Sequence, residues 1–318
     1  MKKDISDFNR YTNVDIQSLK EPFTINQDMS EGYINQTIYP VLPGIFLVLN
    51  DVHTSVVPAA NGEFYNGSKF LLNYCLDGRC EFHLSDVTYS YVKKNMSSIG
   101  TEMVSDFFYY PSAYYLGYEI YAYPTCFTEE TYRILNLFSI DVDFLINHYK
   151  SAGTYFTPKA LTDIWNELYQ IRNQCDAGHI RLMTLGVLSY LCEYRNLPAY
   201  RNLYLTKTQS NIAKRAKEIF TEDLSRHISI KAVAASLGVG ETSLKNYFQS
   251  VYGMNISTFL NDARMRLAAR LLTDSDMSIS DIAKSCGYVN QGRFAKIFYG
   301  YSHMKPLEYR RNGRIKEK

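Results

Sequence analysis

Apolar and polar residues alternate with a period of two through much of the segment from Gly44 to about Tyr123. The clearest runs are rich in β-branched and aromatic residues, which favour strands. These runs lie at residues 45–49, 70–76, 79–84 and 87–92. Asp77-Gly78 separates two of them and predicts a hairpin turn. Several short strands separated by turns predict a β-sandwich or a small barrel.

The period becomes helical from Thr128, which is followed by two glutamates and is therefore predicted to cap a first helix. A second helix is predicted to open at Thr157, which precedes a proline, and a third runs from His179 to about Arg195. A short Asp-Ala-Gly turn joins the last two, so we expect a helical hairpin. We hypothesise that this hairpin carries a dimer contact; packing within its own subunit is the alternative.

Two runs in the last third of the chain share the pattern apolar-Ala-x-x-x-Gly. They occupy residues 233–238 and 282–287, so that Gly238 and Gly287 lie 49 residues apart. Each run predicts a short helix that ends at its glycine, followed by a tight turn and a second helix. The second helices are expected to bury Leu244, Phe248, Phe294 and Phe298. Helix, short turn and helix is the helix-turn-helix pattern, whose second helix enters the major groove of DNA.

A longer helix from about Ser257 to Leu272 is predicted between the two motifs, and it is roughly 25 Å long at 1.5 Å per residue. Its expected buried residues are Phe259, Ala263, Leu267 and Leu271. A rod of this length would place two recognition helices about one turn of DNA apart.

The polar positions on the two second helices are the candidate DNA-reading residues. Helical geometry leaves Thr242, Lys245, Asn246 and Gln249 exposed on the first, and Gln291, Arg293 and Lys296 on the second, with Asn290 at its start. Amide side chains suit adenine and lysine suits guanine. Arg264, Arg266, Arg310 and Arg311 are candidates for phosphate contacts, although Arg264 and Arg266 could equally serve packing and ion pairs.

Charge is distributed unevenly along the 318 residues. The net charge is only +2, yet residues 208–318 carry 18 Lys/Arg against 10 Asp/Glu, while residues 1–207 carry 16 against 22. A basic C-terminal part behind an acidic N-terminal part is typical of a nucleic-acid-binding domain joined to a domain of another function.

The C-terminal segment resembles the DNA-binding domain of the AraC/XylS family over about a third of the chain. The matching residues are 244–248, Tyr252-Gly253, 263–272, Ile282-Ala283, Gly287-Tyr288, 293–298 and 306–311. In detail it is most similar to the subgroup that includes the pyochelin regulator PchR. Ser302-His303 and Tyr299-Gly300 depart from the family pattern, and Gly292 stands where the family often has a side chain at the groove.

This resemblance implies that Thr242, Lys245 and Asn246 occupy base-reading positions, and that a cupin-like β domain precedes the DNA-binding domain. The expected fold class is thus α+β. We expect a β-rich effector-binding domain at 1–126 and a helical segment at 127–196. A linker at 197–208 and a double helix-turn-helix domain at 209–318 should follow. Residues 1–40 are polar and are expected to form a partly ordered arm with a short strand near Phe23.

The other candidate chemistry is weak. Cys75, Cys80, His53 and His83 fall in the strand region, but Cys80 and His83 are three apart and should point to opposite faces of a strand. No catalytic spacing, phosphate loop or cofactor motif occurs, so neither an enzyme nor a cofactor is expected.

Of the 28 tyrosines, 22 precede residue 208; they either line a ligand pocket or are ordinary strand residues. The six scattered cysteines predict reduced thiols in the cytoplasm, and neither a secretion signal nor a membrane-spanning run is expected.

These features predict a sequence-specific transcription regulator that binds operator DNA, forms a homodimer and responds to a small molecule. The subgroup resemblance makes a ferric siderophore one candidate effector. RNA polymerase is a candidate partner of such a regulator. Two alternatives remain open. One is an effector-free regulator controlled by its abundance or by a protein partner. The other is a cupin-type metal-binding enzyme with a C-terminal interaction module.

Overall fold

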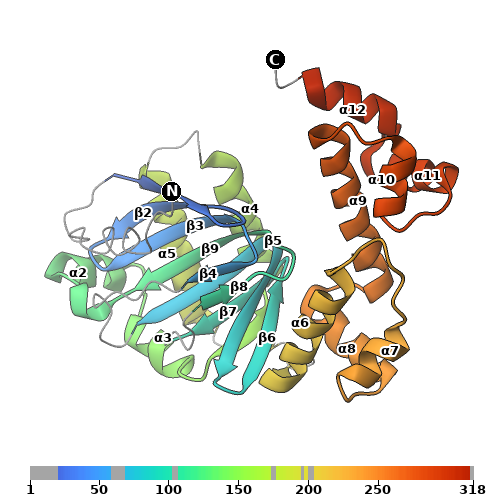
Figure 1. Cartoon of the computed structure of the whole chain (residues 1–318). Helices are drawn as coiled ribbons and strands as arrows, with labels where there is room; N and C mark the ends of the chain where they lie inside the picture. The colour runs from blue at the N-terminus through green and yellow to red at the C-terminus, as the bar shows by residue number, and fades with distance from the viewer. Residues whose placement is uncertain are drawn as a thin grey trace. The chain divides into compact units, whose positions relative to one another are not determined.

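The protein is described here by a computed structural model that covers residues 21–58, 69–101, 107–172, 177–194, 197–199 and 204–315. The chain divides into two compact units, Met1–Lys207 and Thr208–Lys318. Figure 1 shows that strands fill most of the first unit and helices the second. The first unit carries the predicted antiparallel β-rich region and the second the predicted helices, so the α+β fold class is confirmed.

The first unit is built on a nine-stranded antiparallel sheet. Seven strands follow the order β1-β2-β3-β9-β5-β6-β11, β7 pairs with β5, and β10 pairs with β7. A separate two-stranded sheet joins β4 and β8. The strand bounds are β1 Phe23–Met29, β2 Gly32–Leu42, β3 Ile45–His53, β4 Val56–Pro58, β5 Phe70–Ser85, β6 Thr88–Lys93, β7 Met96–Gly100, β8 Phe107–Tyr109, β9 Tyr115–Ala122, β10 Gly153–Phe156 and β11 Leu205–Thr206.

Asp77-Gly78 is not a hairpin turn, contrary to the prediction. β5 runs straight through it: residues 70–78 pair with β9, and residues 79–85 pair with β6. The register shifts between Cys75 and Asp77, so the pair forms an irregularity in the ladder. Gly78 takes a φ of +82°, and a Cβ there would clash with the Tyr114 carbonyl oxygen. The Asp-Gly signal therefore marks a bulge, which also needs positive φ.

The predicted short strand near Phe23 is confirmed, but the rest of the predicted N-terminal arm, where the structure describes it, belongs to a hairpin. Residues 23–42 form the β1–β2 hairpin, in which Phe23 pairs with Ile38 and Met29 with Gly32. Along β1 half-buried and exposed residues alternate, as in an edge strand with one wet face. Residues 1–20 lie outside the described residues.

Helices α2 (Glu129–Leu137), α3 (Val142–His148), α4 (Lys159–Ile171) and α5 (Ala177–Glu193) complete the first unit, with a short 3-10 helix η4 at Pro124–Cys126. Thr128 caps α2 as predicted, since its side chain accepts from the Thr131 amide. Thr157 does not cap α4. The N-cap is Pro158, and the Thr157 hydroxyl instead bonds the Ser97 hydroxyl at 2.8 Å.

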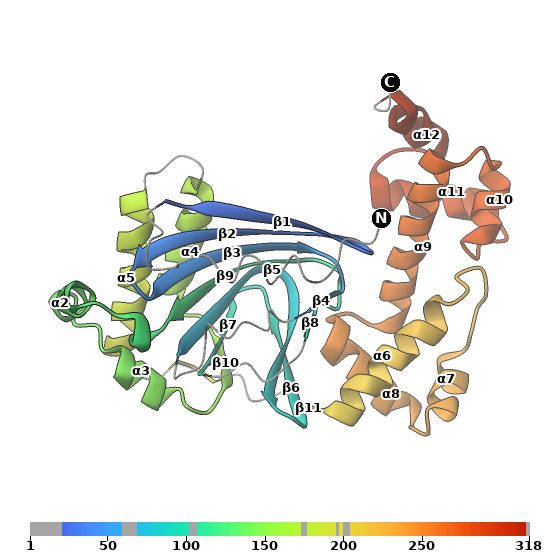
Figure 2. The ribbon, with the colours of Figure 1, turned by 60° about the vertical axis from the view of Figure 1, so that its left-hand side comes forward.

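Helices α3, α4 and α5 cover one face of the sheet (Figure 2). Trp165 of α4 is fully buried between Tyr74 of β5 and Tyr118 of β9, with ring centroids 5.3 and 5.6 Å apart and near-parallel planes. The sheet and these helices therefore share one hydrophobic core, which includes Leu188 of α5.

The segment predicted as a linker, residues 197–208, contributes to the sheet where the structure describes it. Leu205 and Thr206 form β11, which pairs with Tyr89 and Thr88 of β6. The amide of Phe156 donates to the Pro198 carbonyl oxygen at 2.9 Å. Helix α6 then begins at Lys207, directly after β11.

Over residues 207–315 the second unit has seven helices: α6 Lys207–Thr221, α7 Ile230–Ser236, α8 Glu241–Tyr252, α9 Ile256–Asp274, α10 Ile279–Ser285, α11 Gln291–Ser302 and α12 Pro306–Ile315. Helix α9 connects the two motifs. It packs against α8 of the first motif and against α10 and α11 of the second, and also against α12. Its buried face differs in part from the prediction. Phe259 is buried, but the other expected residues are half-buried, and Met265, Ala268 and Leu272 take their place.

Among the described residues, no helix combines the length and the apolar composition needed to cross a bilayer.

Candidate nucleic-acid interface

The first motif consists of α7, a two-residue turn and α8. Ser229 caps α7 by accepting from the Ala232 amide. Gly238 ends it with a φ of +70°, and the amide of Val239 donates back to the Ala234 carbonyl oxygen at 3.0 Å. A left-handed glycine followed by an amide that donates to an earlier carbonyl oxygen is a typical helix C-terminus. It changes the direction of the chain before α8 begins.

The second motif, α10 and α11, repeats this construction. Ser278 caps α10, Gly287 takes a φ of +79°, and the amide of Tyr288 donates to the Ala283 carbonyl oxygen at 2.8 Å. Both glycines adopt the left-handed conformation that L-residues avoid. The shared pattern of the two sequence runs is therefore one local structure formed twice.

The inner faces of α8 and α11 are built as predicted. Leu244 and Phe248 on α8 are fully buried, and so are Phe294 and Phe298 on α11. Phe248 contacts the ring of Phe259 from α9 edge to face, with centroids 5.3 Å apart. Because these buried residues lie four apart, they fix which side of each helix faces solvent.

The predicted reading residues lie on the solvent sides of these helices. All of them are exposed: Thr242, Lys245, Asn246 and Gln249 on α8, Gln291, Arg293 and Lys296 on α11, and Asn290 just before α11. Tyr299 and Tyr301 are also exposed toward the C-terminus of α11. Each second helix thus presents several polar side chains to solvent, one lysine among them.

Lys245 has an intrahelical partner that the sequence reasoning missed. Its ammonium lies 2.6 Å from a carboxylate oxygen of Glu241, one turn earlier, and both side chains are partly exposed. An exposed pair at this spacing contributes only about 0.3–0.5 kcal/mol. Lys245 can therefore exchange this carboxylate for a base edge at low cost.

Asn290 is the N-cap of α11. Its side-chain oxygen accepts from the amide of Arg293 at 2.8 Å and caps α11. Only its amide nitrogen is left to donate to a base or a phosphate.

The turn of the second motif is one residue longer than that of the first. Residues 238 and 239 separate the C-cap of α7 from the N-cap of α8, whereas residues 287–289 separate the caps of α10 and α11. The additional residue is Val289, whose relative exposure is 99%. The sequence held a signal for it, because the glycines are 49 residues apart but Leu244 and Phe294 are 50 apart.

Arg264 is buried at 6% exposure and belongs to the scaffold. Its guanidinium donates to the carbonyl oxygens of Leu224 and Arg226 at 3.0 and 3.1 Å, which ties α9 to the loop before α7. That loop also contacts the second motif, since His227 Nε2 lies 2.9 Å from the Gly287 carbonyl oxygen. Arg264 was predicted either to contact phosphate or to serve packing, and its burial agrees with packing.

Arg310 does for the second motif what Arg264 does for the first. Its guanidinium donates to the carbonyl oxygen of Leu272 in the last turns of α9 at 3.3 Å and to that of Met277, in the loop before α10, at 2.6 Å. Arg266 is ion-paired with Asp262 on the surface of α9, and Arg311 is exposed on α12. Of the four arginines considered for phosphate contacts, Arg266 and Arg311 are the more accessible.

The C-terminus of α11 follows the departure seen in the sequence. His303 takes a φ of +56° at the C-cap, where α8 ends on Gly253 at +75°. Its amide donates to the Tyr299 carbonyl oxygen at 2.8 Å. Histidine thus adopts the left-handed conformation normally left to glycine.

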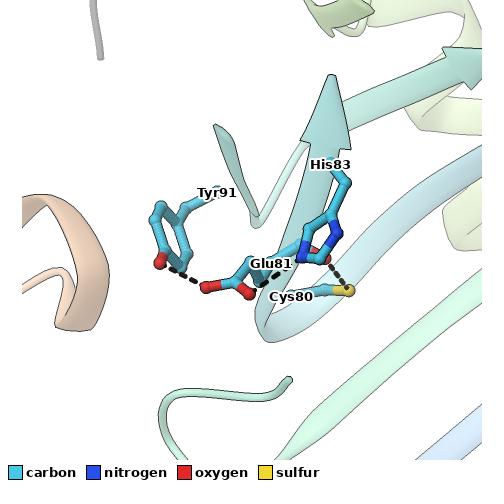
Figure 3. A network of polar contacts seen from close by, with 4 residues as sticks. All are labelled: Cys80, Glu81, His83 and Tyr91. Atoms are coloured by element: carbon cyan, nitrogen blue, oxygen red, sulfur yellow. Dashed lines mark hydrogen bonds and ion pairs between the residues drawn. The ribbon is translucent and has the colours of Figure 1, made fainter. Parts of the chain in front are cut away.

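The cysteine and histidine of the strand region do not converge. Cys80 packs in the apolar cluster on one face of β5, whereas His83 Nε2 lies 3.0 Å from the Glu81 carboxylate on the other. The hydroxyl of Tyr91 donates to the same carboxylate at 2.5 Å (Figure 3). Within the described residues, no group of three or more histidine, cysteine, aspartate or glutamate side chains lies close enough together to hold a metal ion.

Comparisons with known proteins concern mainly the second unit. A family model for a helix-turn-helix domain matches residues 233–312. The porin thermoregulatory protein EnvY of Escherichia coli (strain K12) is 25% identical over 135 residues, which are 42% of this chain and 52% of EnvY. The chain thus matches about half the length of that relative.

Two further likenesses cover most of a smaller protein. The probable transcription factor PqrA of Proteus vulgaris is 31% identical over 86 residues, 27% of this chain and 70% of PqrA. A probable AraC family transcriptional regulator from Rhodopseudomonas palustris CGA009 has a solved structure with 26% identity and a TM-score of 0.30. That likeness covers 32% of this chain and 97% of the other. Through its double helix-turn-helix unit, the chain belongs to the AraC family of DNA-binding proteins.

Proposed function

We propose that the protein is a sequence-specific transcription regulator that binds operator DNA through α8 and α11. The supporting observation is the repeated motif, in which each second helix buries its aromatic side and exposes a polar side with a lysine. Thr242, Lys245, Asn246 and Gln249 would contact one segment of the major groove. Gln291, Arg293, Lys296 and the amide of Asn290 would contact the next, with Arg266 and Arg311 at the phosphates.

Regulation would come from the first unit. An effector bound there would change how the DNA-binding unit is presented or how two copies associate, and RNA polymerase is a candidate partner. The PchR-like assignment, a ferric siderophore as one effector, the homodimer and the domain limits at 126, 196 and 208 stay predictions. The alternative of an enzyme has no catalytic constellation to support it among the described residues.

The test of DNA reading is Lys245→Ala and Lys296→Ala in the full-length protein. Operator sequences are first selected from a random pool, and affinities for the selected and for random DNA are then measured at one salt concentration. Each lysine that contacts a base should contribute about 1–3 kcal/mol of discrimination. We therefore expect either variant to lower affinity for the operator at least fivefold more than for random DNA.

Lys159→Ala is the matched control, because Lys159 is exposed on α4 in the other unit. An equal loss on both DNAs would place the lysine on the phosphates. Equal binding of operator and random DNA by the wild-type protein would reject sequence-specific recognition.

A further inference from the structure

Glu119 lies at the centre of the sheet, on the face that the helices leave uncovered. Paired residues share a face, so Val48, Glu119, Asn73 and Ser98 form one row across β3, β9, β5 and β7. The neighbouring positions along these strands point the other way, into the core with α4 and α5. Figure 2 shows that α3, α4 and α5 all lie on that other side.

Within the part of the chain that the structure describes, the Glu119 carboxylate has hydrogen-bond donors but no cationic partner. The hydroxyl of Tyr121 donates to it at 2.7 Å, and the side chain of Asn50 also donates. No lysine or arginine among the described residues forms an ion pair with it. Burial raises the pKa of Glu119, while these two hydrogen bonds act in the opposite sense.

The polar groups around Glu119 are held in fixed orientations. Gln36 donates to Asn50 at 2.7 Å, and Asn73 donates to the Ser98 hydroxyl at 3.3 Å. Asn73 also accepts from the hydroxyl of Tyr115. Gln36, Glu119 and Tyr121 are nevertheless half-buried, so water reaches this part of the face. Fixed polar groups beside apolar neighbours are the usual composition of a small-molecule site.

We propose that this face of the sheet binds a small effector through a cationic nitrogen, an ammonium or guanidinium group, that donates to the Glu119 carboxylate. The assignment rests on the proposed regulatory function and names the ligand class for its first unit.

Carboxylate chemistry selects this class of ligand. An ionised carboxylate has about four acceptor sites, and two protein donors leave room for more. Buried charges are stable when paired, so a cation gains both hydrogen bonds and charge neutralisation here. A neutral polyol gains the hydrogen bonds alone. An anion, such as a citrate-type iron chelate, would meet like charge.

The test compares thermal unfolding of the full-length protein without DNA in the presence of agmatine, putrescine, galactitol or citrate. Ligands that bind the folded state raise its unfolding temperature by mass action. We expect at least one amine to stabilise the wild-type protein, and Glu119→Gln to weaken its binding at least tenfold. Glu119→Asp keeps the charge and should retain more of the binding than Glu119→Gln.

Glu167→Gln is the control for an unrelated loss of charge, because Glu167 is exposed on α4. Circular dichroism and operator binding establish that each variant is folded. The proposal is overturned if no amine stabilises the protein, if galactitol or citrate does so instead, or if the amine effect survives in Glu119→Gln. Operator binding by the unliganded protein tests the regulator function separately, so the two failures are distinguishable.

Discussion

At the scale of single residues, exposure separates candidate DNA-reading positions from scaffold positions more sharply than residue type does. Arg264 and Arg266 are two residues apart on α9, yet Arg264 is buried on backbone carbonyls and Arg266 lies in a surface ion pair. Composition could not distinguish them. A buried guanidinium needs several acceptors, and the free carbonyl oxygens of the loop before α7 supply them.

Val289 is the residue for which exposure gives the most direct prediction. A fully exposed valine at the start of a recognition helix is suited to an apolar contact with the methyl group of thymine. We expect Val289→Ser to lower operator affinity about fourfold, since one buried methylene is worth about 0.8 kcal/mol.

Replacing thymine by deoxyuridine removes the same contact from the DNA side. At one thymine of the selected operator, this replacement should lower the affinity of the wild-type protein about as much as the Val289→Ser substitution does. The affinity of the Val289→Ser variant should not fall further when the same thymine is replaced. Additive losses at every thymine would show that Val289 touches the sugar-phosphate backbone or nothing at all.

At the scale of elements, the two helix-turn-helix motifs differ in how tightly their glycines are enclosed. A Cβ on Gly238 would meet nothing within 4 Å, whereas one on Gly287 would meet the Leu224 carbonyl oxygen at 2.8 Å. Both positions have positive φ, so alanine is strained by about 1–2 kcal/mol at either. Only Gly287 adds a steric clash with another backbone segment.

We therefore expect Gly287→Ala to destabilise the second unit by more than Gly238→Ala does. Denaturant unfolding of the full-length variants, followed by far-ultraviolet circular dichroism, measures the difference. Equal losses would mean that backbone strain alone accounts for both substitutions and that the loop before α7 yields to the new methyl group.

The elements that the sequence predicted are those whose local signals agree with their tertiary role. Thr128 caps α2, and both glycine turns were visible from spacing alone. The misses arise where a local signal serves a different purpose. Asp77-Gly78 has hairpin chemistry but lies inside β5, because β9 and β6 pair with successive parts of one long strand. The β1–β2 hairpin was missed because its outer strand, β1, is an edge strand in which half-buried residues alternate with exposed polar ones.

The site was predictable to a similar degree. Buried positions four apart fixed the exposed sides of α8 and α11. Partners that come from other elements were not predictable, because loop carbonyl oxygens carry no sequence signature. The carbonyl oxygens of Leu224 and Met277, which bind Arg264 and Arg310, are examples. The Glu119 row was invisible for the same reason, since it depends on the pairing of four strands.

At the scale of the whole molecule, the two units differ in net charge and follow each other directly in the chain. The basic residues are in excess in the helical unit and the acidic ones in the sheet unit, so polyanionic DNA is attracted to one part of the chain. Strand β11 ends at Thr206 and α6 begins at Lys207. The chain therefore passes directly from the last strand of the first unit to α6, the first helix of the second.

The contact between His227 and the Gly287 carbonyl oxygen joins the loop of one motif to the turn of the other. It leaves the protein little freedom to adjust the distance between its two points of DNA contact. One base pair inserted between the two subsites would turn the far subsite by about 34° and move it by about 3.4 Å. We expect such an operator to keep only the affinity of a single subsite in a titration. Undiminished binding would mean that the two motifs swivel independently.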